Sequence, residues 1–432
     1  MHARLRLDIG FAALARAASA SLTAFERAER ARRVEARFSP AGDAVAALSA
    51  RSGFDSYLSA LALPAGSQVL VSGLTIPHMV QILEAHGLEP VPFALDPRTL
   101  APAAGELERR AGARVRAVLF AHLFGQRAEL SELLAEKRRR GWLLWEDCAQ
   151  AYTGDAWRGE GEADVALFSF GLIKTATAIQ GGILRVPDEA VRTRMRAVQA
   201  RWPVQSRRDY LRRVLKAGVL RSLQPSWVFT RFAQACARRG RDLDEVLHAA
   251  TRGFPGADFL TRLRYQPCAP LLEVLDQRLA APARSEAAEK RAFGEALLAA
   301  APLELHGRLA RERHHWVLAL GCDEPAQLVS RLRAAGFDAT ARSSLVPVAA
   351  RDGSAPRASH ELLERLVYVP LALSASAAER AELARLLRET VPLALTPPAP
   401  STVSPSAVSP SAVRIGELAA RAEREAERAP QE

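Results

Sequence analysis

Residues 142–186, WLLWEDCAQAYTGDAWRGEGEADVALFSFGLIKTATAIQGGILRV, decide the fold of this chain. They contain three short apolar runs, at 142–145, 164–170 and 183–186, and such runs are typical of buried strands. Glu146 and Asp147 end the first run, and Lys174 follows the second run after four residues. In open α/β sheets ligands bind at the carboxyl ends of the strands, so the pattern predicts a functional site that contains Asp147 and Lys174.

Lys174 has two interpretations. Most lysines are solvated surface residues. The neighbours of Lys174 are apolar, however, and burial would lower its pKa and make the neutral amine available as a nucleophile. These neighbours are Leu172, Ile173, Ala176, Ala178 and Ile179. A lysine and an aspartate on adjacent strand ends suit pyridoxal 5'-phosphate, because the lysine forms a Schiff base with the cofactor aldehyde and the aspartate keeps the pyridine nitrogen protonated.

Four motifs occur in a fixed order along the chain. They are HLFGQ at 122–126, EDCAQA at 146–151, FSFGLIK at 168–174 and QGG at 180–182. This order resembles the DegT/DnrJ/StrS family of pyridoxal phosphate sugar aminotransferases. The resemblance implies the aspartate-aminotransferase-like fold, type I, with a large, mostly parallel, helix-covered sheet domain and a smaller α+β C-terminal domain. It also implies a homodimer in which each site is completed by the neighbouring subunit.

The resemblance assigns roles to particular residues. Lys174 becomes the Schiff-base lysine and Asp147 the partner of the ring nitrogen. Gln150 would contact the phenolic oxygen of the cofactor, and Ser169 its phosphate. Residues Ser52, Gly53 and Phe54 stand where the family has S-G-T in its phosphate loop, and backbone N–H groups at the start of a helix could still bind the phosphate there.

Several positions depart from the family pattern. Phe54 replaces the threonine of the phosphate loop, and Asp55 would oppose an anion unless it points away. Ile76 stands where many relatives carry an aromatic residue that stacks on the ring, so His78 is the candidate to replace it. Tyr152 replaces a common histidine and Gln180 a common glutamate. These changes leave the cofactor chemistry in place and question the usual amino-sugar substrate.

Composition limits the class of protein. The 432 residues, 49% of them hydrophobic, suffice for a large α/β domain and a smaller one. The four cysteines lie far apart without C-x-x-C spacing, and the adjacent His314 and His315 would face opposite sides of a strand, so no metal site is predicted. A reducing cytoplasm fits this cysteine usage. No apolar run approaches the ~20 residues of a membrane-spanning helix.

The positive charge is concentrated in one segment. The net charge is +11, and residues 192–241 contain fourteen lysines and arginines against one acid, Asp209. Helical spacing would gather Tyr210 with Val214, and Leu211 with Leu215, on one side. Three interpretations stay open: a solvated helical insertion, a helix on the inner face of an anionic membrane, and a binding surface for a substrate diphosphate. No nucleic-acid module accompanies the charge.

The rest of the chain predicts its domains. Strands expected at 68–72, 91–95 and 115–121 alternate with helices at 77–86 and 128–140, which indicates a parallel sheet covered by helices. We expect a large cofactor-binding domain at 1–190, a basic insertion at 191–262 and a small domain at 263–392. Residues 393–432, which repeat SPSAV, form a flexible tail with a short helix at 414–429.

These observations favour an aminotransferase that acts on a keto-sugar, nucleotide-linked, or on a related carbonyl, in polysaccharide or secondary-metabolite biosynthesis. The lysine matters, since members of the family that dehydrate replace it with histidine. Two alternatives remain: elimination or carbon–carbon cleavage with the same cofactor, or a non-catalytic, membrane-associated homologue.

Overall fold

A seven-stranded sheet forms the centre of the protein. The computed structural model describes residues 1–4, 6–251, 253–254, 258–280, 284–301 and 303–390. The strand order is β1-β9-β8-β7-β5-β2-β4, and every neighbouring pair is parallel except the two that involve β9. The strands are β1 (Ala44–Ala47), β2 (Gln68–Ser72), β4 (Glu89–Phe93), β5 (Val115–Ala121), β7 (Leu143–Asp147), β8 (Val165–Ser169) and β9 (Gly182–Arg185). The predicted mostly parallel sheet is confirmed.

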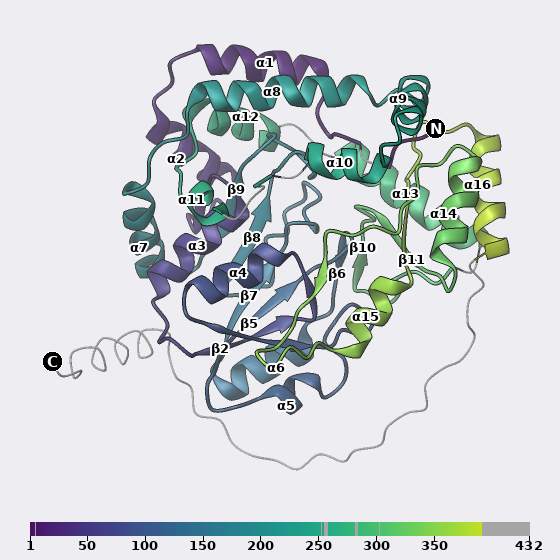
Figure 1. Cartoon of the computed structure of the whole chain (residues 1–432). Helices are drawn as coiled ribbons and strands as arrows, with labels where there is room; N and C mark the ends of the chain where they lie inside the picture. The colour runs from purple at the N-terminus through teal and green to yellow at the C-terminus, as the bar shows by residue number, and fades with distance from the viewer. Residues whose placement is uncertain (5, 252, 255–257, 281–283, 302, 391–432) are drawn as a thin grey trace, which may run out of the picture.

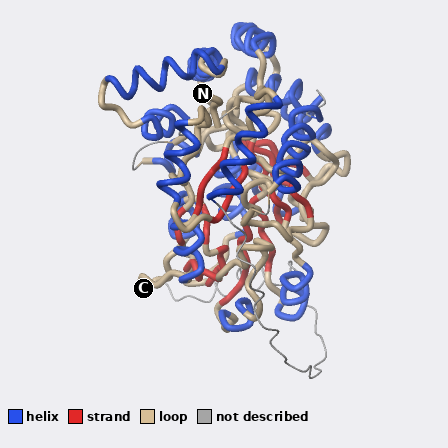
Figure 2. Tube along the Cα trace, turned by 90° about the vertical axis from the view of Figure 1, so that its right-hand side faces the viewer, coloured by secondary structure: helices blue, strands red, loops and turns tan. Residues whose placement is uncertain are grey.

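Helices enclose this sheet, and Figure 2 shows the strands inside a shell of helices. Alternate residues of one strand enter different cores: Val69 of β2 packs with α3 and α4, whereas Leu70 packs with α5 and α6. Both faces of the sheet are therefore apolar, as parallel sheets require. The surrounding helices are α2 (Arg27–Phe38), α3 (Ala50–Leu61), α4 (Pro77–Ala85), α5 (Glu106–Arg110), α6 (Ser131–Arg140), α7 (Glu189–Ala200) and α12 (Ala269–Ala280).

The C-terminal part has a core of its own. Strands β11 (Leu318–Gly321) and β13 (Leu366–Val369) pair antiparallel, and a third apolar cluster joins them to helices. These helices are α13 (Arg284–Ala300), α14 (Pro325–Ala334) and α16 (Ala377–Thr390). Two short strand pairs connect this part to the large sheet region: β6 (Gln126–Arg127) with β10 (Glu312–Arg313), and β3 (Leu74–Thr75) with β12 (Val346–Pro347). Helix α15 (Arg357–Glu364) lies close to β12.

The basic segment forms helices that pack on the protein. Helix α8 (Arg207–Ser222) lies beside α1 (Phe11–Leu22), as Figure 1 shows. Tyr210 and Val214 of α8 are buried as a pair, in agreement with the predicted spacing, but Leu215 is 59% exposed and does not join a core. The Tyr210 hydroxyl donates a hydrogen bond to the Ala178 carbonyl oxygen at 3.0 Å. Helix α8 therefore supports the loop that follows β8.

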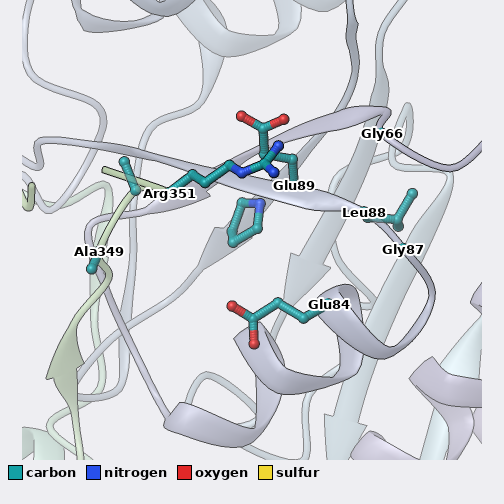
Figure 3. Close-up of a pocket in the computed structure, with 9 residues that line it drawn as sticks. Gly66, Glu84, Gly87, Leu88, Glu89, Ala349 and Arg351 are labelled. Atoms are coloured by element: carbon teal, nitrogen blue, oxygen red, sulfur yellow. The ribbon is translucent and has the colours of Figure 1, made fainter. Parts of the chain in front are cut away.

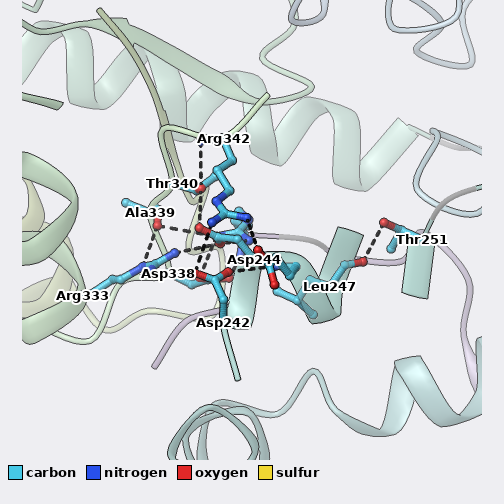
Figure 4. A network of polar contacts seen from close by, with 11 residues as sticks. Asp242, Asp244, Leu247, Thr251, Arg333, Asp338, Ala339, Thr340 and Arg342 are labelled. Carbon is cyan, nitrogen blue, oxygen red and sulfur yellow. Dashed lines mark hydrogen bonds and ion pairs between the residues drawn. The ribbon is translucent and has the colours of Figure 1, made fainter. Parts of the chain in front are cut away.

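The helices that follow α8 in the chain are α9 (Ser226–Arg238), α10 (Leu243–Thr251) and α11 (Phe259–Leu263). Asp244 of α10 lies in a polar network with the C-terminal part (Figure 4). Its carboxylate accepts hydrogen bonds from Arg4 at 2.5 Å, from Arg333 at 2.8 Å and from Thr340 at 2.9 Å. The network joins the N-terminal residues, helix α10 and the C-terminal part.

Most expected elements lie within a few residues of their predicted positions. Strands β2 and β5 occupy the predicted residues, 68–72 and 115–121. Strand β1 was not among the strands predicted from the sequence. None of the described helices is long and apolar enough to cross a membrane. The predicted tail, 393–432, and its helix at 414–429 lie outside the described residues.

Candidate active site

The carboxyl ends of β7 and β8 bring the two predicted catalytic residues into one region. Asp147 is the last residue of β7, and β8 lies next to it in parallel, with Asp147 opposite Leu167. Lys174 lies in the loop after β8, where its backbone N–H donates to the Gly171 carbonyl oxygen at 2.9 Å. Both side chains are partly exposed. Both residues thus lie at the edge of the sheet that the sequence pattern predicted for them.

The Lys174 amine is unusual among the lysines of this chain. Burial lowers the pKa of Lys174 to about 8, while Asp147 acts to raise it and Arg51 to lower it further. The sequence has only four lysines, and two of the others form ion pairs: Lys137 with Asp164 at 2.6 Å and Lys290 with Glu286 at 3.2 Å. No described carboxylate forms such a pair with Lys174. Its Nζ instead lies 4.0 Å from the centroid of the Trp316 ring.

Asp147 is held as a hydrogen-bond acceptor at the strand end. Its Oδ1 accepts from the Ala149 backbone N–H at 2.9 Å. Burial raises the pKa of Asp147, and the Ala149 hydrogen bond and the charge of Lys174 oppose that change. A partly exposed carboxylate placed in this way can pair with a cationic N–H group.

Gln150 and Ser169 flank this region. Gln150 Oε1 accepts a hydrogen bond from the Phe124 backbone N–H at 2.7 Å. The amide NH2 of Gln150 is thereby left as the donating side of the group. Ser169 is the last residue of β8 and is partly exposed, like Gln150. The geometry suits the donor roles that the resemblance implies for both residues.

The expected phosphate loop at Ser52, Gly53 and Phe54 is helical instead. Helix α3 begins at Ala50, because the Ser49 hydroxyl accepts a hydrogen bond from the Ser52 N–H at 3.1 Å and so caps the helix. The three predicted residues point into the protein: the Ser52 hydroxyl donates to the Leu263 carbonyl at 2.6 Å, a Cβ on Gly53 would lie 2.0 Å from Leu184, and Phe54 packs on Trp145 at 5.6 Å.

The N-terminus of α3 presents Arg51, which the sequence reasoning missed. The N–H groups of Ala50 and Arg51 have no acceptor within the helix. The Arg51 guanidinium lies 2.7 Å from His78 Nδ1 and 4.7 Å from the Phe254 ring centroid. Burial lowers the pKa of Arg51 to about 10, with Asp147 acting to raise it. No described carboxylate forms an ion pair with this guanidinium. The available signal was the cap serine, Ser49, two residues before it.

The remaining predicted residues lie at the start of α4. Ile76 is the N-cap residue of α4 and is partly exposed. His78 stacks on Phe259, with ring centroids 4.6 Å apart and an interplanar angle of 24°. One face of His78 therefore already contacts an aromatic ring. Asp55 points away from the start of α3, since it accepts hydrogen bonds from Arg264 at 2.9 Å and lies 2.9 Å from His86 Nε2.

The QGG motif has a structural reason. A Cβ on Gly182 would lie 2.2 Å from the Ala50 nitrogen, so only glycine lets the start of α3 approach β9 this closely. Gln180, which replaces the glutamate of the family, accepts a hydrogen bond from Gln205 at 2.7 Å. Gln205, from the basic segment, thus provides a hydrogen-bond donor for the neutral side chain of Gln180.

His122 and Cys148 have structural surroundings. His122 Nε2 lies 2.9 Å from Glu146 Oε1, and both side chains are fully buried. Burial raises the pKa of the Cys148 thiol, which disfavours the reactive thiolate. Cys148 is therefore a core residue.

Figure 3 shows a separate cavity of about 420 Å³. It is lined by residues at the start of β4 and the end of α4, with Glu84, Glu89 and Arg351 among them. The start of β4 belongs to the amino-terminal edge of the parallel strands, opposite the edge that carries Asp147. The cavity is thus distinct from the candidate site.

Comparison with known proteins gives two findings. The sequence model described as the DegT/DnrJ/EryC1/StrS aminotransferase family matches residues 12–217. Solved structures resemble the whole described fold. The aminotransferase TlmJ from Streptoalloteichus hindustanus has 19% identity and a TM-score of 0.64, covering 90% of this chain and 98% of that chain. The sugar aminotransferase CalS13 from Micromonospora echinospora has 21% identity and a TM-score of 0.64, covering 90% and 100%.

A third structure similar to this chain is a mutant of GDP-4-keto-6-deoxymannose-3-dehydratase (ColD) with bound GDP-perosamine. Its identity is 14% and its TM-score 0.65, covering 90% of this chain and 100% of that chain. The same fold thus occurs in two transferases and in one dehydratase. The three likenesses establish the fold of this chain.

Proposed function

We propose that this chain, which belongs to the DegT/DnrJ/EryC1/StrS aminotransferase family of pyridoxal phosphate enzymes, transfers an amino group to the carbonyl carbon of a nucleotide-linked keto-sugar. The observation that supports this proposal most is Lys174, whose pKa is lowered to about 8 by burial at the edge of the sheet that also carries Asp147. An amine of this kind is a competent nucleophile and proton carrier near neutral pH.

The residues fit the cofactor at both of its ends. A phosphate needs donors and positive charge, and the start of α3 offers the N–H groups of Ala50 and Arg51 together with a guanidinium that forms no ion pair with any described carboxylate. Ser169 is a further donor. Asp147 would pair with the protonated ring nitrogen, and the Gln150 amide would donate to the phenolic oxygen. We therefore propose that the phosphate binds at Ala50 and Arg51, two residues before the position that the motif alone suggested.

When bound, the cofactor supplies an electron sink for a carbanion at the carbon that carries the transferred nitrogen. Lys174 would bond to the cofactor aldehyde and, once displaced by the amino donor, move a proton between donor and cofactor carbons. With a pKa of about 8, about a tenth of the free amine is neutral at pH 7. Asp147 would keep a proton on the ring nitrogen. Arg51 and His78 would hold the phosphate side in place.

The substrate class rests on the relatives. One similar structure, DesI, was solved in the presence of its TDP-sugar product, and another contains GDP-perosamine. These ligands support a nucleotide-linked sugar for the present chain as well. Dehydration of such a sugar is the second candidate, since ColD is a dehydratase. Lys174 favours transamination, because its amine can both anchor the cofactor and carry the proton.

The test of this proposal is reconstitution and turnover. Purified protein mixed with pyridoxal phosphate should absorb as a yellow complex, and an amino donor such as glutamate should bleach it. Incubation with a nucleotide-linked keto-sugar should then yield the amino sugar by mass spectrometry. Loss of oxygen from the sugar without gain of nitrogen would establish dehydration instead. Protein that stays colourless and cannot be reconstituted would support the non-catalytic alternative.

Two proposals concern partners. We propose a homodimer, which light scattering of the purified protein tests; a monomer that retains full turnover would contradict it.

We also propose that the exposed face of α8 and α9 contacts anionic membranes. Its apolar residues Leu215, Val219 and Trp227 are 59%, 65% and 68% exposed and lie in the basic segment. Sedimentation with anionic vesicles, weakened by salt, tests this contact, and equal recovery with neutral vesicles would contradict it.

A further inference from the structure

Trp316 contacts the Lys174 loop at two points. Its ring centroid lies 4.0 Å from Lys174 Nζ, within the range of a cation–π interaction. Its indole N–H donates a hydrogen bond of 3.1 Å to the carbonyl oxygen of Ile173, the residue before the lysine. One side chain thus contacts both the amine and the backbone that carries it. Trp316 lies 142 positions further along the chain, just before strand β11 of the C-terminal part.

The backbone around Trp316 is fixed in this orientation. His315 has a left-handed conformation, with φ at +50°, and its ring is fully buried with Nε2 3.1 Å from Glu295 Oε1. A non-glycine residue with such a φ is uncommon and needs support from its surroundings. On the other side, a Cβ on Gly125 would lie 2.3 Å from the Trp316 nitrogen, so the glycine of the HLFGQ motif permits this close approach.

We propose that Trp316 is a positioning residue for Lys174: its ring face holds the amine whenever the amine is not bonded to the cofactor, and its N–H holds the Ile173 carbonyl. This inference rests on the proposed function of Lys174. A carboxylate at this position would hold the amine protonated, because opposite charges in a partly buried site stabilise the charged form strongly. A ring stabilises the ammonium only moderately, so the amine stays in place and still loses its proton near neutral pH.

The charged groups that act on the Lys174 amine are Asp147 from β7 and Arg51 from α3. Asp147 raises the pKa of Lys174 and Arg51 lowers it. A substitution of Trp316 leaves both groups in place, so the change in the pKa of Lys174 reports the contribution of Trp316. The test uses the apoprotein and therefore does not depend on turnover. Acetic anhydride at limiting concentration labels the lysines over a pH series, and peptide mass spectrometry reports the apparent pKa of Lys174, with exposed Lys216 as internal reference.

Replacing the ring tests the first contact. In W316L we expect the pKa of Lys174 to fall by about 0.5 to 1, because the cation–π stabilisation of the ammonium is lost. In W316F we expect a value within about 0.3 of wild type, since a ring remains. W227L is the matched control, because Trp227 is 68% exposed on α9. A pKa that rises in W316L would show that Trp316 only covers the amine from water, and an unchanged pKa would show no contact; either result overturns the proposal.

Hydrogen exchange tests the second contact. W316F lacks the indole N–H, so we expect several-fold faster amide exchange in the peptide that contains residues 171–178, while W227L leaves that exchange unchanged. Exchange equal to wild type in W316F would contradict the role of the N–H bond, and this measurement remains decisive if W316L fails to fold. Wild-type protein that does not bind pyridoxal phosphate would remove the proposed function, yet these apoprotein readouts would still report on the Trp316 contacts.

Discussion

Arg51 provides the sharpest test of where the cofactor phosphate binds. The variant R51Q removes the positive charge and keeps a hydrogen-bonding side chain. Burial lowers the pKa of Arg51 to about 10. Such a depression corresponds to about 3 kcal/mol of unfavourable burial at most, and to about 1 to 3 kcal/mol once partial exposure is considered. A bound phosphate would offset this cost and accept a charge-assisted hydrogen bond worth about 1.5 to 3 kcal/mol.

We therefore expect two opposite effects of R51Q: weaker binding of pyridoxal phosphate and a more stable apoprotein. In R51Q the Kd for pyridoxal phosphate should rise about 10- to 150-fold, because the charge-assisted hydrogen bond is lost. The Kd for pyridoxal, which has no phosphate, should change by less than about 2-fold. The free energy of unfolding of the apoprotein should increase by up to about 3 kcal/mol, because the variant removes a buried charge that forms no ion pair with a described carboxylate.

The assay is an absorbance titration of the apoprotein with each aldehyde, together with urea unfolding. R357Q is the matched control, since the Arg357 side chain is 92% exposed and pairs with Glu361 four residues away in α15. The control should change neither Kd nor stability by more than about 0.5 kcal/mol. An R51Q protein that binds pyridoxal phosphate as tightly as wild type would refute the phosphate position. Equal losses for both aldehydes would show damage to the whole site instead.

Three further predictions follow from the same geometry. The rate of pyridoxal phosphate loading should rise with pH and level off above about pH 8, because loading needs the neutral Lys174 amine and the pKa of that amine is about 8; stopped-flow absorbance measures it, and a rise continuing to pH 10 would contradict the lowered pKa. D147N should reduce kcat by about 10² to 10⁴ and move the loading profile to lower pH, because Asp147 raises the pKa of Lys174; an unshifted profile would contradict the coupling. G182A should destabilise the protein by about 1 to 3 kcal/mol in urea unfolding, since its Cβ would lie 2.2 Å from the Ala50 nitrogen, whereas G161A has open space and should be neutral.

The sequence predicted the parts of the site that depend on strand ends. Lys174 and Asp147 follow apolar runs that are typical of buried strands, and the fold places both residues near the ends of those strands. The start of α3 was misplaced because Ser49 and Ser52 both suit a helix cap, and only the packing against Gly182 decides between them. The short strand before α3 is alanine-rich, which gives a weak strand signal.

Long-range contacts were outside the reach of sequence patterns. Trp316 precedes strand β11, which begins at Leu318, and the left-handed His315 turns the chain just before Trp316. Arg51 belongs to no motif that the sequence analysis used, because the S-G-T pattern of the phosphate loop contains a hydroxyl and no arginine. The exposed Leu215 of α8 shows the same limit, since helical spacing alone cannot say which face meets the protein.

Reduction with borohydride in the presence of pyridoxal phosphate tests the central claim most directly. With four lysines in the chain, peptide mass spectrometry can assign the reduced cofactor to one of them. We predict that it is attached to Lys174 in stoichiometric yield and is absent in K174A, while Lys137, Lys216 and Lys290 stay unmodified. Attachment to another lysine, or no attachment in wild-type protein that has been exposed to the cofactor, would contradict the role of Lys174.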